Sequence, residues 1–94
     1  MIRMIGSRHT FSVGATTLKV FHAAQGDGLP RHTHPYPHAT ICHAGAIKVS
    51  KENKSLTMNK DTQPVDLPAN EWHEIEALED GTVFVNISLT DVTN

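Results

Sequence analysis

Two prolines separate histidines in the middle of the chain, in the run His34-Pro35-Tyr36-Pro37-His38. Proline has no backbone N–H to donate, so two of them within three residues exclude a central β-strand and require a turn. His32 lies two residues before His34, and side chains two residues apart leave the same face of a strand. Imidazole is a common metal ligand, because near neutral pH it offers an uncharged nitrogen lone pair. The stretch predicts a strand with two histidines on one face, a turn, and a third histidine that begins the next strand.

Most of the remaining chain alternates polar and apolar residues with the period of two that half-buried strands show. Helical periodicity is nearly absent, and only 78–80 and the N-terminus could hold a turn of helix. Short strands at regular spacing predict an all-β sandwich or barrel. The expected strands are 10–13, 16–23, 32–34, 38–43, 46–50, 55–58, 65–67, 72–77 and 82–89, with turns at 25–28 and 51–54 and a frayed tail at 91–94.

The length of 94 residues predicts a single domain, 1–94. A chain of this size buries only about 60–65% of the surface that its unfolded form exposes, so dimerisation would help it. We expect a homodimer in which the outward apolar faces carrying Phe11, Phe21 and Phe84 are covered.

Charge and composition exclude several classes of function. The net charge of −2 and the pI near 6.3 give no basic patch for nucleic acid or an anionic membrane. No apolar run approaches the ~20 residues that span a bilayer, and the first six residues are too weakly apolar for a secretory signal. The single cysteine, Cys42, cannot form an internal disulfide, which indicates a reducing compartment. We expect a cytoplasmic protein.

The stretch 26–45 resembles the first sequence motif of the cupins. That motif runs Gly, five residues, His-x-His, three or four residues, Glu, six residues, Gly. Here Gly26, His32, His34 and Gly45 stand at those spacings, and the one departure is His38 in place of glutamate.

The stretch 62–77 resembles the second cupin motif, which runs Gly, five residues, Pro-x-Gly, two residues, His, three residues, Asn. Pro68 and His73 stand in place, whereas Thr62 and Asn70 replace the glycines and Ala77 replaces the final asparagine. Asparagine for glycine is mild, because asparagine tolerates the left-handed backbone region.

The resemblance implies a small jelly-roll barrel of the double-stranded β-helix type, with one divalent transition metal held by four histidines. The metal ligands that it implies are His32, His34, His38 and His73. With a histidine at position 38 in place of the glutamate, the set of ligands is similar to that of the all-histidine subgroup of cupins. Zn, Ni, Cu, Fe and Mn all suit four imidazoles.

The alternation around His73 supports the fourth ligand independently. His73 shares a strand face with Ile75 and Ala77, so it points inward and needs a partner there. A second interpretation stays open for His38, as a hydrogen-bonded core histidine in a barrel that has lost its metal.

Side chains outside the ligand set have other expected roles. His9, His22 and His43 are expected to be exposed or structural. Candidates to line the pocket are Tyr36, Thr40, Cys42 and Ile75.

Four neutral ligands leave the charge of a divalent ion uncompensated, which favours an anionic ligand such as hydroxide, an enolate or a carboxylate. The resemblance implies oxygenase, isomerase or lyase chemistry on a small organic acid, sugar acid or enol. The alternative is a non-catalytic module that binds or senses a metal or a small ligand, since cupin functions diverge too widely for the fold to decide.

Overall fold

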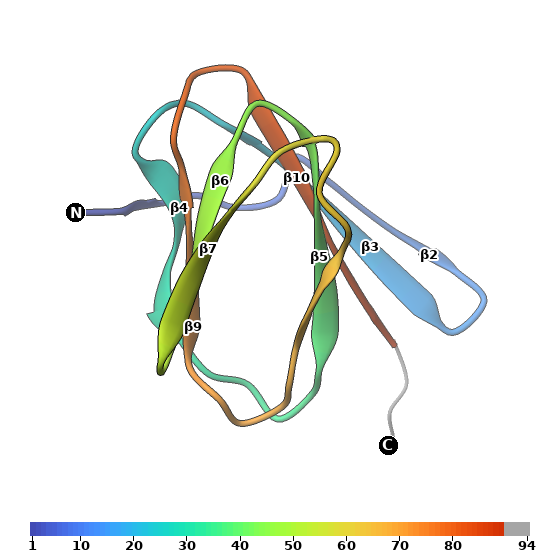
Figure 1. The fold of residues 1–94 in the computed structure, drawn as a ribbon. Coiled ribbons are helices and arrows are strands. Elements are labelled where there is room, and N and C mark those ends of the chain that lie inside the picture. The colour runs from blue at the N-terminus through green and yellow to red at the C-terminus, as the bar shows by residue number, and fades with distance from the viewer. Residues whose placement is uncertain (90–94) are drawn as a thin grey trace.

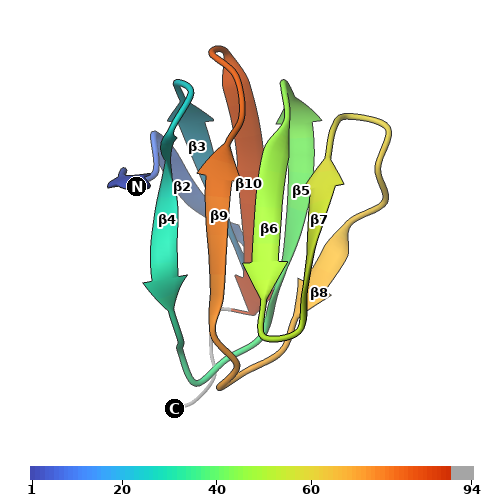
Figure 2. The same cartoon turned by 60° about the vertical axis from the view of Figure 1, so that its left-hand side comes forward.

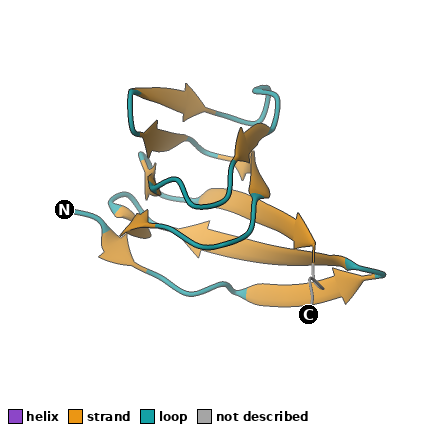
Figure 3. Cartoon of the chain, turned by 90° about the horizontal axis from the view of Figure 1, so that it is seen from below, coloured by secondary structure: helices purple, strands orange, loops and turns teal. Residues whose placement is uncertain are grey.

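The computed structural model describes residues 1–89, so the tail expected at 91–94 lies outside the described residues. Every element in residues 1–89 is a strand or a loop (Figure 3). This part of the chain therefore contains no helix that is long and apolar enough to cross a membrane. The strands are β1 (Arg3–Met4), β2 (His9–Val13), β3 (Thr16–Ala23), β4 (Asp27–His32), β5 (His38–Ala44), β6 (Ile47–Lys51), β7 (Lys54–Met58), β8 (Val65–Leu67), β9 (His73–Ala77) and β10 (Thr82–Leu89).

The strands form two five-stranded sheets that face each other (Figure 1). We call the sheet with the order β1-β4-β9-β6-β7 sheet A, and the sheet with the order β2-β3-β10-β5-β8 sheet B. Every strand pair is antiparallel except β1 with β4. The chain crosses repeatedly from one sheet to the other, which is the arrangement of a double-stranded β-helix. The all-β jelly-roll prediction is confirmed.

One hydrophobic core fills the space between the sheets. Phe21 of β3 and Phe84 of β10 stack there with ring centroids 4.8 Å apart, and both are buried. The prediction that these two rings point outward is therefore wrong. Register is the reason: Phe21 is the direct partner of Phe84, so both side chains leave the same, inner face of sheet B. Phe11 does lie on the outside, 49% exposed.

The prediction of a strand at 32–34 is also wrong, because β4 begins earlier, at Asp27, and ends at His32. The pairing of β4 with β9 shifts between Leu29 and His32, whose partners are Ile75 and His73. One extra residue in β4 therefore forms a β-bulge around Pro30, a usual place for proline in a sheet. The bulge lets both Leu29 and His32 face inward although they are three residues apart.

The structure also differs from the sequence predictions in one turn, in the segment 78–80 and in a short N-terminal strand. The hairpin between β6 and β7 closes through two residues, Glu52 and Asn53, and not through the four expected. The segment 78–80 holds no helix. The alternating pattern missed β1, which has only two residues; it is fixed by backbone hydrogen bonds and by the Arg3 side chain, which donates to Asp27 Oδ1 at 2.9 Å.

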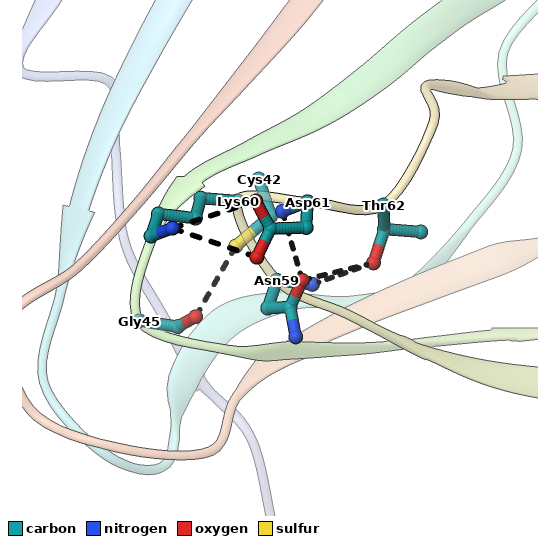
Figure 4. Close-up of polar contacts among 6 residues, drawn as sticks. All are labelled: Cys42, Gly45, Asn59, Lys60, Asp61 and Thr62. Atoms are coloured by element: carbon teal, nitrogen blue, oxygen red, sulfur yellow. Dashed lines mark hydrogen bonds and ion pairs between the residues drawn. The ribbon is translucent and has the colours of Figure 1, made fainter.

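The second motif folds without its glycines. Asn70 has a φ of 67°, so it does take the left-handed conformation that a glycine would. Thr62 is not among the described residues with positive φ, which explains why threonine is tolerated there. Its hydroxyl instead contacts the Asn59 side-chain oxygen, which also accepts a hydrogen bond from the Asp61 backbone at 2.8 Å (Figure 4).

Candidate metal centre

Four histidines from three strands and one loop meet at the same end of the barrel, the lower end in Figure 2. His32 ends β4, His73 begins β9 and His38 begins β5, whereas His34 lies in the loop between β4 and β5. The ligand atoms of His32, His34 and His73 all lie within 4.8 Å of one another. His38 joins this group through its Nε2, which is 3.2 Å from Nε2 of His73.

Each of the four rings is oriented by a contact to its Nδ1. The Nδ1 atoms of His32 and His34 lie 2.7 Å from the carbonyl oxygens of Pro30 and Tyr36, and Nδ1 of His73 lies 3.2 Å from that of Glu71. A carbonyl oxygen only accepts, so these three Nδ1 atoms carry the hydrogen and their Nε2 atoms carry a free lone pair. Partners of this kind fix the tautomer of metal-binding histidines.

The fourth ring has the same tautomer. The Thr40 hydroxyl donates to Asn86 Oδ1 at 2.7 Å, so toward Nδ1 of His38, 3.4 Å away, its oxygen acts as the acceptor. The Nε2 of His38 is then unprotonated and faces the unprotonated Nε2 of His73. With no hydrogen between them, these two nitrogens repel each other unless a cation lies between them.

Their spacing fits a shared metal ion. Two nitrogens bound to one zinc at about 2.0–2.1 Å lie about 2.8–3.4 Å apart when the angle at the metal is roughly 90–110°. The observed 3.2 Å between Nε2 of His38 and Nε2 of His73 falls in that range. The cluster could therefore hold a metal ion through four neutral nitrogen ligands.

Burial keeps three of these ligands, His34, His38 and His73, uncharged. It lowers the pKa of His38 to about 4, reinforced by the neighbouring His73 and His34 rings. It also lowers the pKa of His73 to about 4, reinforced by His32. Burial lowers the pKa of His34 as well, with smaller effects of His32 and Lys19. Near neutral pH these three rings are therefore unprotonated, which is the form that binds a metal.

The two sequence motifs contact each other at the loop that carries His34. The backbone N–H of Asn70 donates to the carbonyl oxygen of His34 at 2.9 Å. On the same loop, the Tyr36 ring stacks on the His34 ring at a centroid distance of 4.2 Å and an interplanar angle of 11°. These contacts hold His34 in place, although it lies outside any strand.

A cavity of about 310 Å³ opens beside the cluster. Its lining combines three of the histidines with Tyr36, which was expected there, and with residues that the sequence did not single out. The full lining is Ile5, Gly6, Ser7, Lys19, Phe21, Leu29, His32, His34, Tyr36, His38, Asn86 and Ser88.

The other expected pocket residues do not line this cavity. Thr40, Cys42 and Ile75 do point inward, but they are fully buried in the packed interior beyond the histidines. The Cys42 thiol donates to the carbonyl oxygens of Ala44 and Gly45, and Figure 4 shows the contact with Gly45. Burial raises the pKa of this thiol. A buried thiol with a raised pKa is a structural side chain and not a nucleophile.

The three remaining histidines lie outside the cluster. His9, His22 and His43 are exposed, as expected. His9 and His22 contact each other edge to face on β2 and β3, with centroids 6.1 Å apart.

Solved structures of low sequence identity share this fold. A cupin 2 domain-containing protein from Halorhodospira halophila matches with a TM-score of 0.79 at 18% identity, over 95% of this chain and 68% of that chain. An uncharacterized conserved protein with a double-stranded beta-helix domain from Klebsiella pneumoniae gives a TM-score of 0.75 at 15% identity, over 95% and 75%. A cupin-2 domain containing protein from Shewanella frigidimarina gives 0.71 at 11% identity, over 88% and 81%.

No protein family model and no curated protein sequence matches the chain. The structural likeness nevertheless confirms the expected class: this is a protein with the cupin fold, a double-stranded β-helix. Its particular feature is a cluster of four histidines at one end of the barrel that could hold a metal.

Proposed function

We propose that this protein is a metal-dependent enzyme of the oxygenase, isomerase or lyase type that acts on a small organic acid, sugar acid or enol. The observation that carries the proposal is the approach of the Nε2 atoms of His38 and His73 to 3.2 Å beside a cavity, while the Nδ1 atom of each ring contacts another acceptor. A metal ion satisfies both nitrogens at once, and the cavity gives a small molecule access to it.

The residues of the site have two roles, to bind the metal and to orient the rings that bind it. His32, His34, His38 and His73 would bind one divalent transition metal, and carbonyl oxygens and the Thr40 hydroxyl hold their rings in the metal-binding tautomer. Four ligands leave two positions of a six-coordinate metal open to a substrate. When bound, such a metal supplies a Lewis acid that polarises a substrate oxygen, or a centre that activates dioxygen.

One observation favours a second candidate, a non-catalytic module that binds a metal or a small ligand. Residues 1–89 contribute to the cavity lining no aspartate or glutamate that could act as a general base. Both candidate functions involve a bound metal, and only the enzyme would convert a substrate to a product.

The first test is the metal content of tag-free protein by elemental analysis. We expect about one transition metal per chain in the wild type and a loss of most of it in His34→Ala and His73→Ala. His43→Ala is the matched control, because His43 is exposed and lies outside the cluster. A wild type that takes up no metal after reconstitution would refute the metal site.

The metal then directs the functional assay. Redox-active iron, manganese or copper calls for oxygen-consumption screens, whereas zinc or nickel calls for lyase and isomerase screens. Binding of small acids without turnover in these screens would favour the binding module.

We further propose that the protein is a cytoplasmic homodimer. The unpaired Cys42 supports a reducing compartment. The dimer is supported by the outer face of sheet B, where β2, β3, β10 and β5 present apolar side chains that nothing in residues 1–89 covers. Phe11, Leu18, Ile87 and Ala39 follow one another across these four strands. This row carries no charged side chain on the four strands, and Asp66 of β8 lies at its edge, so the row can pack on its own copy without like-charge repulsion within it.

A further inference from the structure

The cavity beside the cluster carries positive charge and no negative charge. Besides the histidines, Lys19 is the only charged side chain that residues 1–89 contribute to its lining. Serine, asparagine and tyrosine side chains add neutral polar groups, and Ile5, Phe21 and Leu29 form an apolar wall. A divalent ion on the neutral histidines would bring the charge of the site to about +3.

Lys19 reaches the cavity because of its place in sheet B. It lies on β3 two residues before the buried Phe21, so it leaves the same, inner face of the strand. Its direct partner on β10 is Asn86, which also lines the cavity.

Among residues 1–89, no carboxylate forms an ion pair with the ammonium group of Lys19. The ion pairs among residues 1–89 join Arg3 to Asp27 and Lys60 to Asp61, and neither involves Lys19. Lys19 is solvent-exposed and lines a cavity to which residues 1–89 contribute no acid, so it is suited to bind an anionic group of a ligand.

On the basis of the proposed metal site, we propose that Lys19 binds one carboxylate of a small dianionic ligand. The second anionic group of this ligand occupies the open positions of the metal. Two anionic groups on one ligand would compensate the positive charge of the bound metal ion and of Lys19. The cavity volume of about 310 Å³ lies at the lower end of the ~300–1,000 Å³ range of ligand pockets, so the ligand is short. The apolar wall contacts its carbon skeleton. The substrate class is a short dicarboxylate or a carboxylate-bearing enolate.

The test compares dicarboxylates with monocarboxylates of equal chain length. Co²⁺-loaded protein is titrated with malonate and succinate, and with propionate and butyrate, by calorimetry and by the visible absorption of the cobalt ion. Lys19→Met removes the charge and keeps much of the side chain, whereas Lys19→Arg keeps the charge. Lys48→Met is the matched control, because Lys48 is exposed on β6 in sheet A and does not line the cavity.

We expect the wild type to bind at least one dicarboxylate about tenfold or more tightly than the monocarboxylate of equal length, since a hydrogen bond to a charged group contributes an effect of this size. Lys19→Met loses this preference at unchanged cobalt content, and Lys19→Arg and Lys48→Met retain it. The absorption change shows that the ligand reaches the metal.

Two results would overturn the assignment and leave the metal site intact: equal dicarboxylate affinities in Lys19→Met and the wild type, or no dicarboxylate preference in the wild type. Failure of the wild type to bind cobalt is a different outcome, which would overturn the proposed function and this assignment with it.

Discussion

The Nε2 atoms of His38 and His73 lie 3.2 Å apart, although the residues are 35 positions apart in sequence and belong to different sheets. Each ring donates its Nδ1 hydrogen elsewhere, so the two facing nitrogens both carry lone pairs. The fold thus holds two groups together that repel each other in the metal-free protein. The same contact becomes favourable when a cation binds both nitrogens, which couples metal binding to the packing of sheet A on sheet B.

Metal binding should therefore stabilise the fold strongly. At a free metal concentration 1,000 times the Kd, a ligand that binds only the folded state adds about 4 kcal/mol to the free energy of unfolding. In a domain of this size each 1 kcal/mol raises the Tm by about 4–8 °C, so a rise of well over 10 °C is expected. Thermal unfolding with Zn²⁺ and with EDTA measures it. Equal Tm values under both conditions would contradict the site.

The metal-free protein should lose stability in mild acid. The pKa of His38 and of His73 is about 4 in the fold, against 6.5 for a free histidine. Between these values the unfolded chain binds protons that the folded chain does not, so the free energy of unfolding falls as the pH falls from 6.5 to 4. The contribution of the two groups is fully present above pH 6.5.

Urea unfolding in EDTA at pH 7.5, 6.0 and 5.0 measures this dependence. His38→Gln should make the loss of stability smaller, because one of the histidines with a lowered pKa is gone. His43→Gln, at an exposed histidine, should leave the loss as in the wild type. A His38→Gln protein that loses as much stability as the wild type would contradict the argument.

The sequence predicts most of the strands and the inward direction of His73, because both depend on local alternation. It also places Asn70 correctly in the left-handed region, since few residue types tolerate it. These are properties of short segments, and no knowledge of strand partners is needed to find them.

What depends on register could not be predicted. The bulge at Pro30 brings His32 to the inner face beside His73, and no spacing within β4 alone reveals it. Lys19 enters the cavity only because β3 pairs with β10 in a register that places it beside Asn86. Alternation in 16–23 does put Lys19 on the same face of the strand as Phe21. It does not show which of the two faces points into the barrel. The same gap led to the wrong orientation for Phe21 and Phe84.

Replacing His38 by the glutamate usual in the cupin motif tests the charge of the site. His38→Glu should still bind about one metal per chain, because a carboxylate is also a metal ligand. Its negative charge lowers the net charge of the loaded site, so the affinity for malonate or succinate should fall by about tenfold. Metal content and calorimetry on the same samples measure both effects. Undiminished dicarboxylate affinity at full metal content would contradict the charge argument.

Phe84→Ala should be among the most destabilising single substitutions in the chain. Phe84 is fully buried and stacks on Phe21, and truncation of a buried phenylalanine costs about 3–5 kcal/mol. This is a large share of the ~5–15 kcal/mol stability of a typical domain. Met4→Ala, at a side chain 77% exposed, should change the free energy of unfolding by less than about 0.5 kcal/mol. Urea unfolding of both variants checks the contrast, and equal effects would mean that the stacked pair is not part of the core.

A charge on the outer face of sheet B should separate the proposed dimer. Phe11 is 49% exposed on β2, beside Leu18 of β3, so Phe11→Asp leaves the core intact. In a symmetric dimer each substitution acts twice, and burying an unpaired carboxylate is strongly unfavourable. We expect the wild type to sediment as a dimer at micromolar concentration and Phe11→Asp as a monomer with nearly the same Tm in dilute solution. Thr57→Asp, on the exposed surface of β7 in sheet A, is the control and should stay dimeric. A monomeric wild type, or a dimeric Phe11→Asp, would show that this face is not the interface.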